Sequence, residues 1–148
     1  KRLENVPIFI PVANGGMGTV VRAGTFMGSV SAKMHRYYLE NALKKPPFNV
    51  FRKAGQALHH IVAHGDHRAA GARKKLASLK IDIDEAWNGV FLPATPKSPN
   101  PTGAIVHSML HTDEYYFTVE RLLQKAKSRK EGIQVLRKIR ESLENGTF

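Results

Sequence analysis

The absence of cysteine constrains the fold of this 148-residue chain more than any other feature of its sequence. No disulfide and no thiolate metal centre can hold the fold together, so any metal ion must be bound by His, Asp, Glu or Asn. A chain of this length can bury one apolar core without such staples, and its 42% hydrophobic residues are enough for one. We therefore expect one globular domain, with room for an N-terminal appendage.

Apolar spacing separates a glycine-rich N-terminal part from a mostly helical remainder. Residues 1–30 alternate apolar stretches with glycines, which predicts short strands or extended segments joined by turns. Short strands are also predicted at residues 57–63 and 89–92, and a proline-rich loop at residues 94–103. Helical periodicity predicts helices at residues 31–45, 67–79, 112–127 and 130–143. This order of elements indicates an α+β fold that is mostly helical.

Polar residues and glycine mark where these elements begin and end. Ser31 and Thr112 are predicted N-caps of the first and third helices, and Gly146 is a predicted C-terminal stop. Asp82 or Asp84 is expected to cap a short turn before the second of the two strands.

The chain is strongly basic, with 23 Lys and Arg against 12 Asp and Glu and a formal net charge of +11. This charge favours a polyanionic partner, of which nucleic acid is the commonest; an anionic membrane surface and an acidic protein are the alternatives. No run of about 18 apolar residues is present, so no membrane-spanning segment is expected.

Basic side chains concentrate on the predicted helix at residues 67–79. Contacts to backbone phosphates position a nucleic acid without reading its sequence, so we expect little sequence specificity. A second basic cluster at residues 125–130 is either a further phosphate contact or a solvated helix face. The residues predicted to bind nucleic acid are Arg68, Arg73, Lys74 and Lys75.

Six of the seven histidines lie between residues 59 and 111, and their spacing is the strongest chemical signal in the chain. His59 and His60 are adjacent on a predicted strand, where successive side chains point to opposite faces. One of them can therefore bind a metal ion while the other reaches the substrate. His107 and His111 are four residues apart, which on a helical turn places both rings on one face. Adding His59 to this pair gives three neutral imidazoles with open coordination positions, which is typical of a catalytic metal site.

The remaining histidines are interpreted differently. His64 follows His60 by four residues and is an alternative ligand, although Gly65 and Asp66 predict a turn there. His35 lies on the first predicted helix and is interpreted as structural or solvent-facing. Neither belongs to the predicted site.

Three separated segments resemble, in this order, the AHH nucleases of the HNH/endonuclease VII superfamily. They are residues 58–63, 81–93 and 107–116, and the resemblance covers about residues 55–148. The chain departs from the family pattern at Leu58, which stands where the family has the alanine of its name. This change replaces one apolar residue by another at a strand position.

The resemblance implies a ββα-metal core within residues 51–148, with residues 1–50 as an N-terminal extension of unassigned function. It also implies one divalent metal ion, either Mg²⁺ or Zn²⁺, with Ni²⁺ and Mn²⁺ as alternatives.

Roles for individual residues follow from the same resemblance. His59, His107 and His111 are expected to bind the ion, and His60 to act as the general base that activates water. Asn88 is expected either to orient the loop and His60 or to touch the metal ion.

AHH nucleases are found as C-terminal toxin domains of bacterial polymorphic toxins and secreted effectors. The expected function is therefore metal-dependent, sequence-nonspecific hydrolysis of DNA by an antibacterial toxin, with an acidic immunity protein as partner. Such a toxin is secreted or delivered into a target cell and acts in its cytoplasm. The alternatives are an RNase toxin, a non-catalytic basic module that binds nucleic acid around a structural metal, and an interaction domain for an acidic protein.

Overall fold

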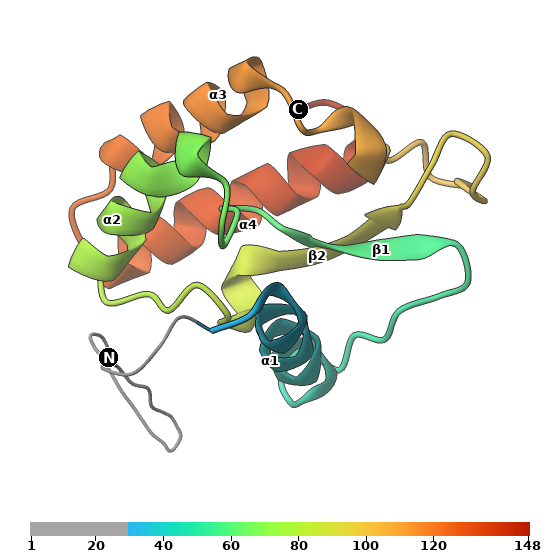
Figure 1. Ribbon diagram of the computed structural model, residues 1–148, viewed down its shortest axis with the longest axis horizontal. Helices are drawn as coiled ribbons and strands as arrows, with labels where there is room; N and C mark the ends of the chain where they lie inside the picture. The colour runs from blue at the N-terminus through green and yellow to red at the C-terminus, as the bar shows by residue number, and fades with distance from the viewer. Residues whose placement is uncertain (1–29) are drawn as a thin grey trace.

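A two-stranded antiparallel sheet lies between helices in residues 30–148, the part of the chain that the computed structural model describes (Figure 1). Strand β1 (Gln56–His60) pairs with β2 (Gly89–Pro93), so that His59 lies opposite Val90 and His60 opposite Gly89. The strands predicted before residue 30 lie outside the described residues.

Strand β1 ends at His60, three residues earlier than predicted, because Asn88 takes up the hydrogen bonds of the backbone that follows. The amide of Ile61 donates to the Asn88 carbonyl oxygen at 2.8 Å, and the amide of Val62 donates to the Asn88 side-chain oxygen at 2.9 Å. The chain bends at these two residues and leaves the sheet.

Helices occupy the positions that the apolar spacing predicts. The described helices are α1 (Ala32–Lys44), α2 (Ala70–Ser78), α3 (Asp113–Gln124) and α4 (Arg129–Asn145). Short 3-10 turns lead into α2, β2 and the loop before α3; they are η1 (His67–Ala69), η2 (Ala86–Asn88) and η3 (His107–Met109). The α+β, mostly helical fold class is confirmed. None of the helices in residues 30–148 is long and apolar enough to cross a membrane.

The predicted helix boundaries are confirmed where a cap defines them. The hydroxyl of Ser31 accepts from the amide of Met34, and that of Thr112 accepts from the amide of Tyr115, each at 3.2 Å. Gly146 follows α4 with a φ of 73°, a left-handed conformation that glycine adopts without steric cost. Helix α3 ends at Gln124, earlier than predicted.

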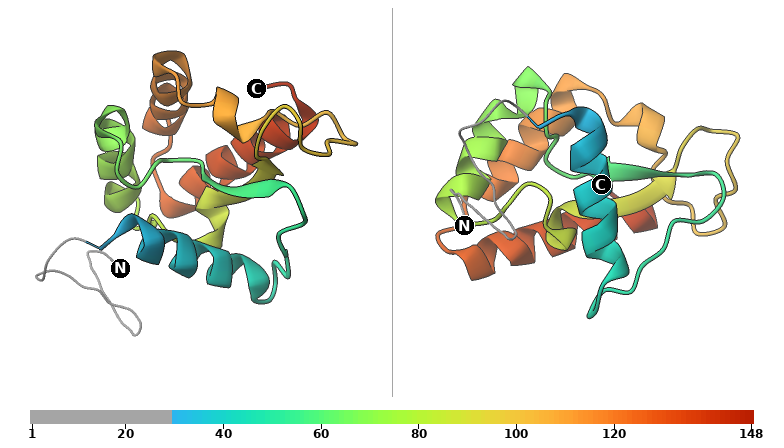
Figure 2. Two further views of the ribbon diagram at one scale, coloured as in Figure 1. Left: turned by 45° about the vertical axis from the view of Figure 1, so that its right-hand side comes forward. Right: turned by 60° about the horizontal axis from the view of Figure 1, so that its bottom comes forward.

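The two faces of the sheet bury separate apolar clusters. Leu92 packs into the larger cluster with α2, α3 and α4, whereas Phe91 packs with Leu39 of α1. Figures 1 and 2 show α1 on the opposite side of the sheet from α2 and α3. At Gly89 a Cβ would lie only 2.8 Å from the Leu39 side chain, so glycine permits this close approach. Helix α1, which falls within the predicted N-terminal extension, thus packs directly on the sheet.

Candidate active site

The two adjacent histidines of β1 point to opposite sides of the strand, as strand geometry predicts, and each joins a different polar cluster. His59 contacts His107 and Tyr115 on the side of α3. His60 contacts Asp84, in the loop that precedes η2. Both rings are buried, so each depends on its partners for hydrogen bonding.

The protonation state of His59 follows from its hydrogen bonds. The Tyr115 hydroxyl donates to the carbonyl oxygen of Ile61 at 2.8 Å, so its oxygen accepts from Nε2–H of His59 at 2.7 Å. A neutral imidazole carries one proton, which leaves the lone pair of His59 on Nδ1. That atom faces Nδ1 of His107 at 3.1 Å.

His107 and His111 extend this cluster towards solvent. The centre of the His107 ring lies 5.0 Å from that of the exposed His111, whose Nδ1 is hydrogen-bonded with the Tyr116 hydroxyl at 3.2 Å. Burial and then the charge of His107 lower the pKa of His59 well below its ordinary value, and burial and then the charge of His111 lower that of His107. Both rings are therefore neutral at neutral pH, the state in which imidazole binds a metal ion.

The predicted metal ligands lie close together but do not form a preformed metal site. The second ring nitrogen of His59 is held by Tyr115, the arrangement in which imidazoles commonly ligate metals. Within residues 30–148, no group of three or more His, Cys, Asp or Glu side chains is placed so that it could hold a metal ion. Two imidazole nitrogens converge and His111 lies beside them, so an ion bound here would have to take further ligands from water and substrate.

His60 is anchored through a single carboxylate. Its Nε2 donates to Oδ1 of Asp84 at 2.9 Å, and Oδ2 of the same carboxylate accepts from Nδ1 of His35 at 2.8 Å. Burial alone would raise the pKa of Asp84, but the hydrogen bonds from His35 and His60 outweigh it and hold the pKa below its ordinary value. Asp84 is therefore an ionised carboxylate between two imidazoles.

His64 packs beside His60 and not beside His59. Its ring stacks on that of His35, with centroids 4.8 Å apart, and lies 4.9 Å from that of His60. Burial and the charges of His35 and His60 lower the pKa of His64 to about 4. The side chain of His35, which was interpreted as structural or solvent-facing, is only 17% exposed and hydrogen-bonded.

Asn88 is fully buried and joins the two loops that flank His60 and Asp84. Its side-chain oxygen accepts from the amide of Val62, and its side-chain amide donates to the carbonyl oxygens of Val62 and Ile83 at 3.0 and 2.9 Å. The Asn88 side chain thus links the backbones of the two loops by hydrogen bonds.

A family model described as a nuclease family of the HNH/ENDO VII superfamily with conserved AHH matches residues 41–145. The chain belongs to the AHH nuclease family. The matched residues include the adjacent pair His59-His60, which the sequence resemblance equates with the histidine pair of the family name and which β1 divides between two clusters. The substrate of this nuclease is a nucleic acid. Comparisons with curated proteins and with solved structures found no match.

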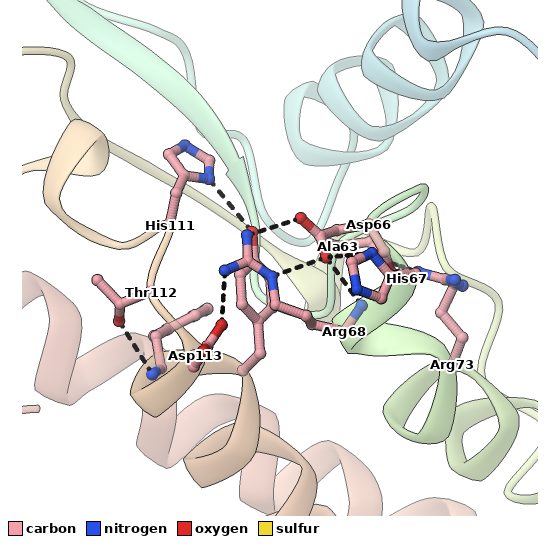
Figure 3. Close-up of polar contacts among 10 residues, drawn as sticks. Ala63, Asp66, His67, Arg68, Arg73, His111, Thr112 and Asp113 are labelled. Atoms are coloured by element: carbon pink, nitrogen blue, oxygen red, sulfur yellow. Dashed lines mark hydrogen bonds and ion pairs between the residues drawn. The ribbon is translucent and has the colours of Figure 1, made fainter.

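Arg68 of this AHH nuclease, predicted to bind phosphate, is engaged by two carboxylates (Figure 3). Its guanidinium donates to both oxygens of Asp66 at 3.0 and 2.9 Å and to Asp113 at 2.8 Å. It also lies 4.5 Å from the centre of the Tyr116 ring, whose hydroxyl contacts His111. The arginine therefore borders the His59 cluster with its charge largely compensated.

The other basic residues predicted to bind nucleic acid lie on α2. Arg73 donates to the carbonyl oxygens of Ala63 and Asp66 at 2.9 and 2.7 Å and so braces the loop after β1. Lys74 is exposed and Lys75 is partly exposed. A phosphate backbone can contact these two lysines while Arg73 keeps its hydrogen bonds to the loop after β1.

Sequence reasoning did not assign Asp84 or Tyr115 to the site. Asp84 was considered only as a cap of a turn, and Tyr115 only as part of a resembling segment. Both lie within such segments, at residues 81–93 and 107–116, which was the available signal. Their roles depend on contacts with His60 and His59 across 24 and 56 positions of sequence.

Proposed function

We propose that this AHH nuclease is a metal-dependent endonuclease that hydrolyses DNA phosphodiester bonds with little sequence specificity. The observation that carries the proposal is the division of one histidine pair between two environments. His59 presents a nitrogen lone pair to His107, whereas His60 is hydrogen-bonded to an ionised carboxylate. The first environment suits a metal ligand and the second suits a general base.

His60 has the chemistry that a general base needs. In its neutral form Nε2–H donates to Asp84, so Nδ1 carries the lone pair and accepts a proton from the attacking water. The adjacent carboxylate stabilises the imidazolium that forms and maintains the tautomer. A general base of this kind contributes about 10²–10⁴-fold to the rate.

His59, His107 and His111 would hold one divalent metal ion. When bound, the ion supplies charge stabilisation at the phosphoryl and leaving oxygens. Tyr115 keeps the His59 lone pair on Nδ1. Neutral imidazoles suit Zn²⁺ and Ni²⁺, whereas Mg²⁺ and Mn²⁺ bind through more oxygen ligands from water and phosphate. We propose Zn²⁺ or Mg²⁺ as the working ion.

Lys74 and Lys75 are proposed to contact backbone phosphates, with Arg68 as a neighbouring cation whose charge is shared with Asp66 and Asp113. Asn88 is proposed to act by orienting the loops around His60. Phosphate contacts of this kind carry no sequence information.

The biological role proposed for the domain is that of an antibacterial toxin, secreted or delivered into a target cell and acting in its cytoplasm. A net charge of +11 favours an acidic immunity protein as the inhibitor, because opposite potentials steer and strengthen such a complex. This role is supported by the family membership and the charge.

The test is cleavage of supercoiled plasmid by the purified 148-residue chain, stripped of metal and supplied with Mg²⁺, Zn²⁺, Ni²⁺ or Mn²⁺ in turn. His60→Ala should abolish nicking while retaining DNA binding. His67→Ala, at a side chain that is 94% exposed, is the matched control and should cleave normally.

Three outcomes would contradict the proposal. Retention of DNA without nicking under every metal would indicate a non-catalytic binding module. Cleavage of a transcript but not of plasmid would indicate an RNase. Nicking by His60→Ala at the wild-type rate would remove His60 from the mechanism.

A further inference from the structure

Helix α1 contributes a polar contact to the immediate surroundings of the proposed general base. The carboxylate of Asp84 bonds His60 through one oxygen and His35 of α1 through the other, at 2.9 and 2.8 Å. His35 precedes residues 41–145, the part of the chain that the family model matches. We infer that His35 and Asp84 form a positioning pair that fixes the ring of His60, so that α1 is part of the catalytic unit. This inference rests on the proposed role of His60 as the base.

The backbone around Asp84 is held from several directions. Its amide donates to the Asp82 carboxylate at 2.8 Å, and the carbonyl oxygen of the preceding Ile83 accepts from Asn88. The next residue, Glu85, is held by both terminal nitrogens of Arg129 at 2.6 and 2.8 Å. These contacts fix the backbone of Asp84. Rotation of its carboxylate is restricted by the hydrogen bond from His35.

The second oxygen of Asp84 explains why His35 matters. A carboxylate with one donor can turn about its last single bond and present either oxygen, or neither, to His60. When Oδ2 accepts from His35, the carboxylate plane is fixed and Oδ1 faces Nε2 of His60. A buried carboxylate with two imidazole donors also stays ionised, as the acceptor role requires.

The packing of α1 holds His35 in place. Leu39 and Leu43, one and two turns further along the helix, lie on the same face as His35 and are buried against the sheet. The His35 ring is also stacked on His64. The packing of α1 on the sheet therefore places His35 where it orients the His60 ring through Asp84.

The experiment compares His35→Leu, which removes the donor, with His35→Asn, whose side-chain amide can replace Nδ1–H. Asp84→Asn tests the carboxylate, and His67→Asn at an exposed position is the matched control. Each full-length variant is assayed for kcat and KM on DNA with the activating metal. Ring ¹⁵N NMR of histidine-labelled protein then reports the tautomer of His60.

We expect kcat to fall about 10- to 100-fold in His35→Leu and Asp84→Asn, within the contribution of a general base. KM should change little, and the His60 ring should change from a single Nε2–H tautomer to a mixture. His35→Asn should recover most of kcat, and His67→Asn should match wild type. Recovery by asparagine separates positioning from a loss of folding.

A wild-type kcat in His35→Leu would overturn the inference and leave the nuclease proposal intact. Absence of cleavage by the wild-type chain would overturn the nuclease proposal instead. In that case the NMR comparison still decides the positioning pair, because an unchanged His60 tautomer in both His35→Leu and Asp84→Asn contradicts it.

Discussion

His59 donates a hydrogen bond from Nε2 to the Tyr115 hydroxyl at 2.7 Å, and Tyr115 in turn donates to the Ile61 carbonyl oxygen at 2.8 Å. The direction of this chain leaves the lone pair of His59 on Nδ1. Burial raises the pKa of Tyr115, so the hydroxyl keeps its proton over the whole range in which the protein works. Tyr115 therefore holds His59 in the tautomer that the proposed metal site requires.

Tyr115→Phe should weaken metal binding by about 10- to 100-fold, the usual effect of removing the partner that orients an imidazole ligand. It should also lower the free energy of unfolding by about 1–3 kcal/mol, because buried groups on His59 and Ile61 lose their partner. Calorimetric titration with Zn²⁺ and urea denaturation measure the two effects. Tyr37→Phe, at a ring that is 58% exposed, is the control and should change neither quantity. Equal metal affinity for Tyr115→Phe and wild type would contradict the proposed role of Tyr115 in orienting His59.

Local sequence patterns were enough to predict the elements and the split of the histidine pair. Period-2 and helical spacing located the strands and helices, and the alternation of a strand placed His59 and His60 on opposite faces. The ends of β1 and α3 were predicted too late in the chain, since tertiary hydrogen bonds such as those of Asn88 determine the end of β1.

The partners of the site residues could not be predicted, because they come from distant parts of the chain. His35 lies 49 positions from Asp84, and Asp113 lies 45 positions from Arg68. Burial of Leu39 against the sheet brings α1 to Asp84, and a charge count along the sequence cannot reveal that Arg68 is compensated. Neither contact has a periodic or local signature.

Asn88→Ala should be strongly destabilising. It leaves two buried backbone groups of Val62 and the partly buried carbonyl oxygen of Ile83 without their partner, and the expected loss is about 3 kcal/mol or more in the free energy of unfolding. Urea denaturation measures it, and Gln134→Ala on the exposed side of α4 is the control. If Asn88→Ala lost activity with unchanged stability, Asn88 would act on the substrate or the metal ion and not on the loops.

Stability should fall as the pH decreases from about 6.5 to 4, in part because of His64. Its pKa is about 4 in the folded protein, against an ordinary value of 6.5. Between these values the unfolded chain takes up a proton that the folded chain does not, so the free energy of unfolding decreases with falling pH. Above pH 6.5 the ring is neutral in both states and contributes no slope.

His64→Gln should therefore flatten the pH dependence of stability between pH 6.5 and 4. Urea midpoints measured in the presence of a chelator at half-unit pH intervals give the comparison, with His67→Gln at an exposed position as control. Identical slopes for wild type and His64→Gln would show that His64 titrates alike in the folded and unfolded chain.

Asp113→Asn should strengthen DNA binding by releasing Arg68 from one of its two carboxylate partners. The Asp113 side chain is 89% exposed and accepts from one terminal nitrogen of Arg68 at 2.8 Å, so the substitution releases that nitrogen for a phosphate while Asp66 keeps the other two. One added phosphate contact should steepen the dependence of log K on log salt by about 0.9. Fluorescence anisotropy with a labelled duplex in EDTA, between 50 and 200 mM salt, measures affinity without cleavage.

Glu144→Gln, the control, makes the same change in net charge at an exposed position on α4. An equal salt slope in the two variants would mean that the gain is one of overall charge and that Arg68 makes no contact with the substrate.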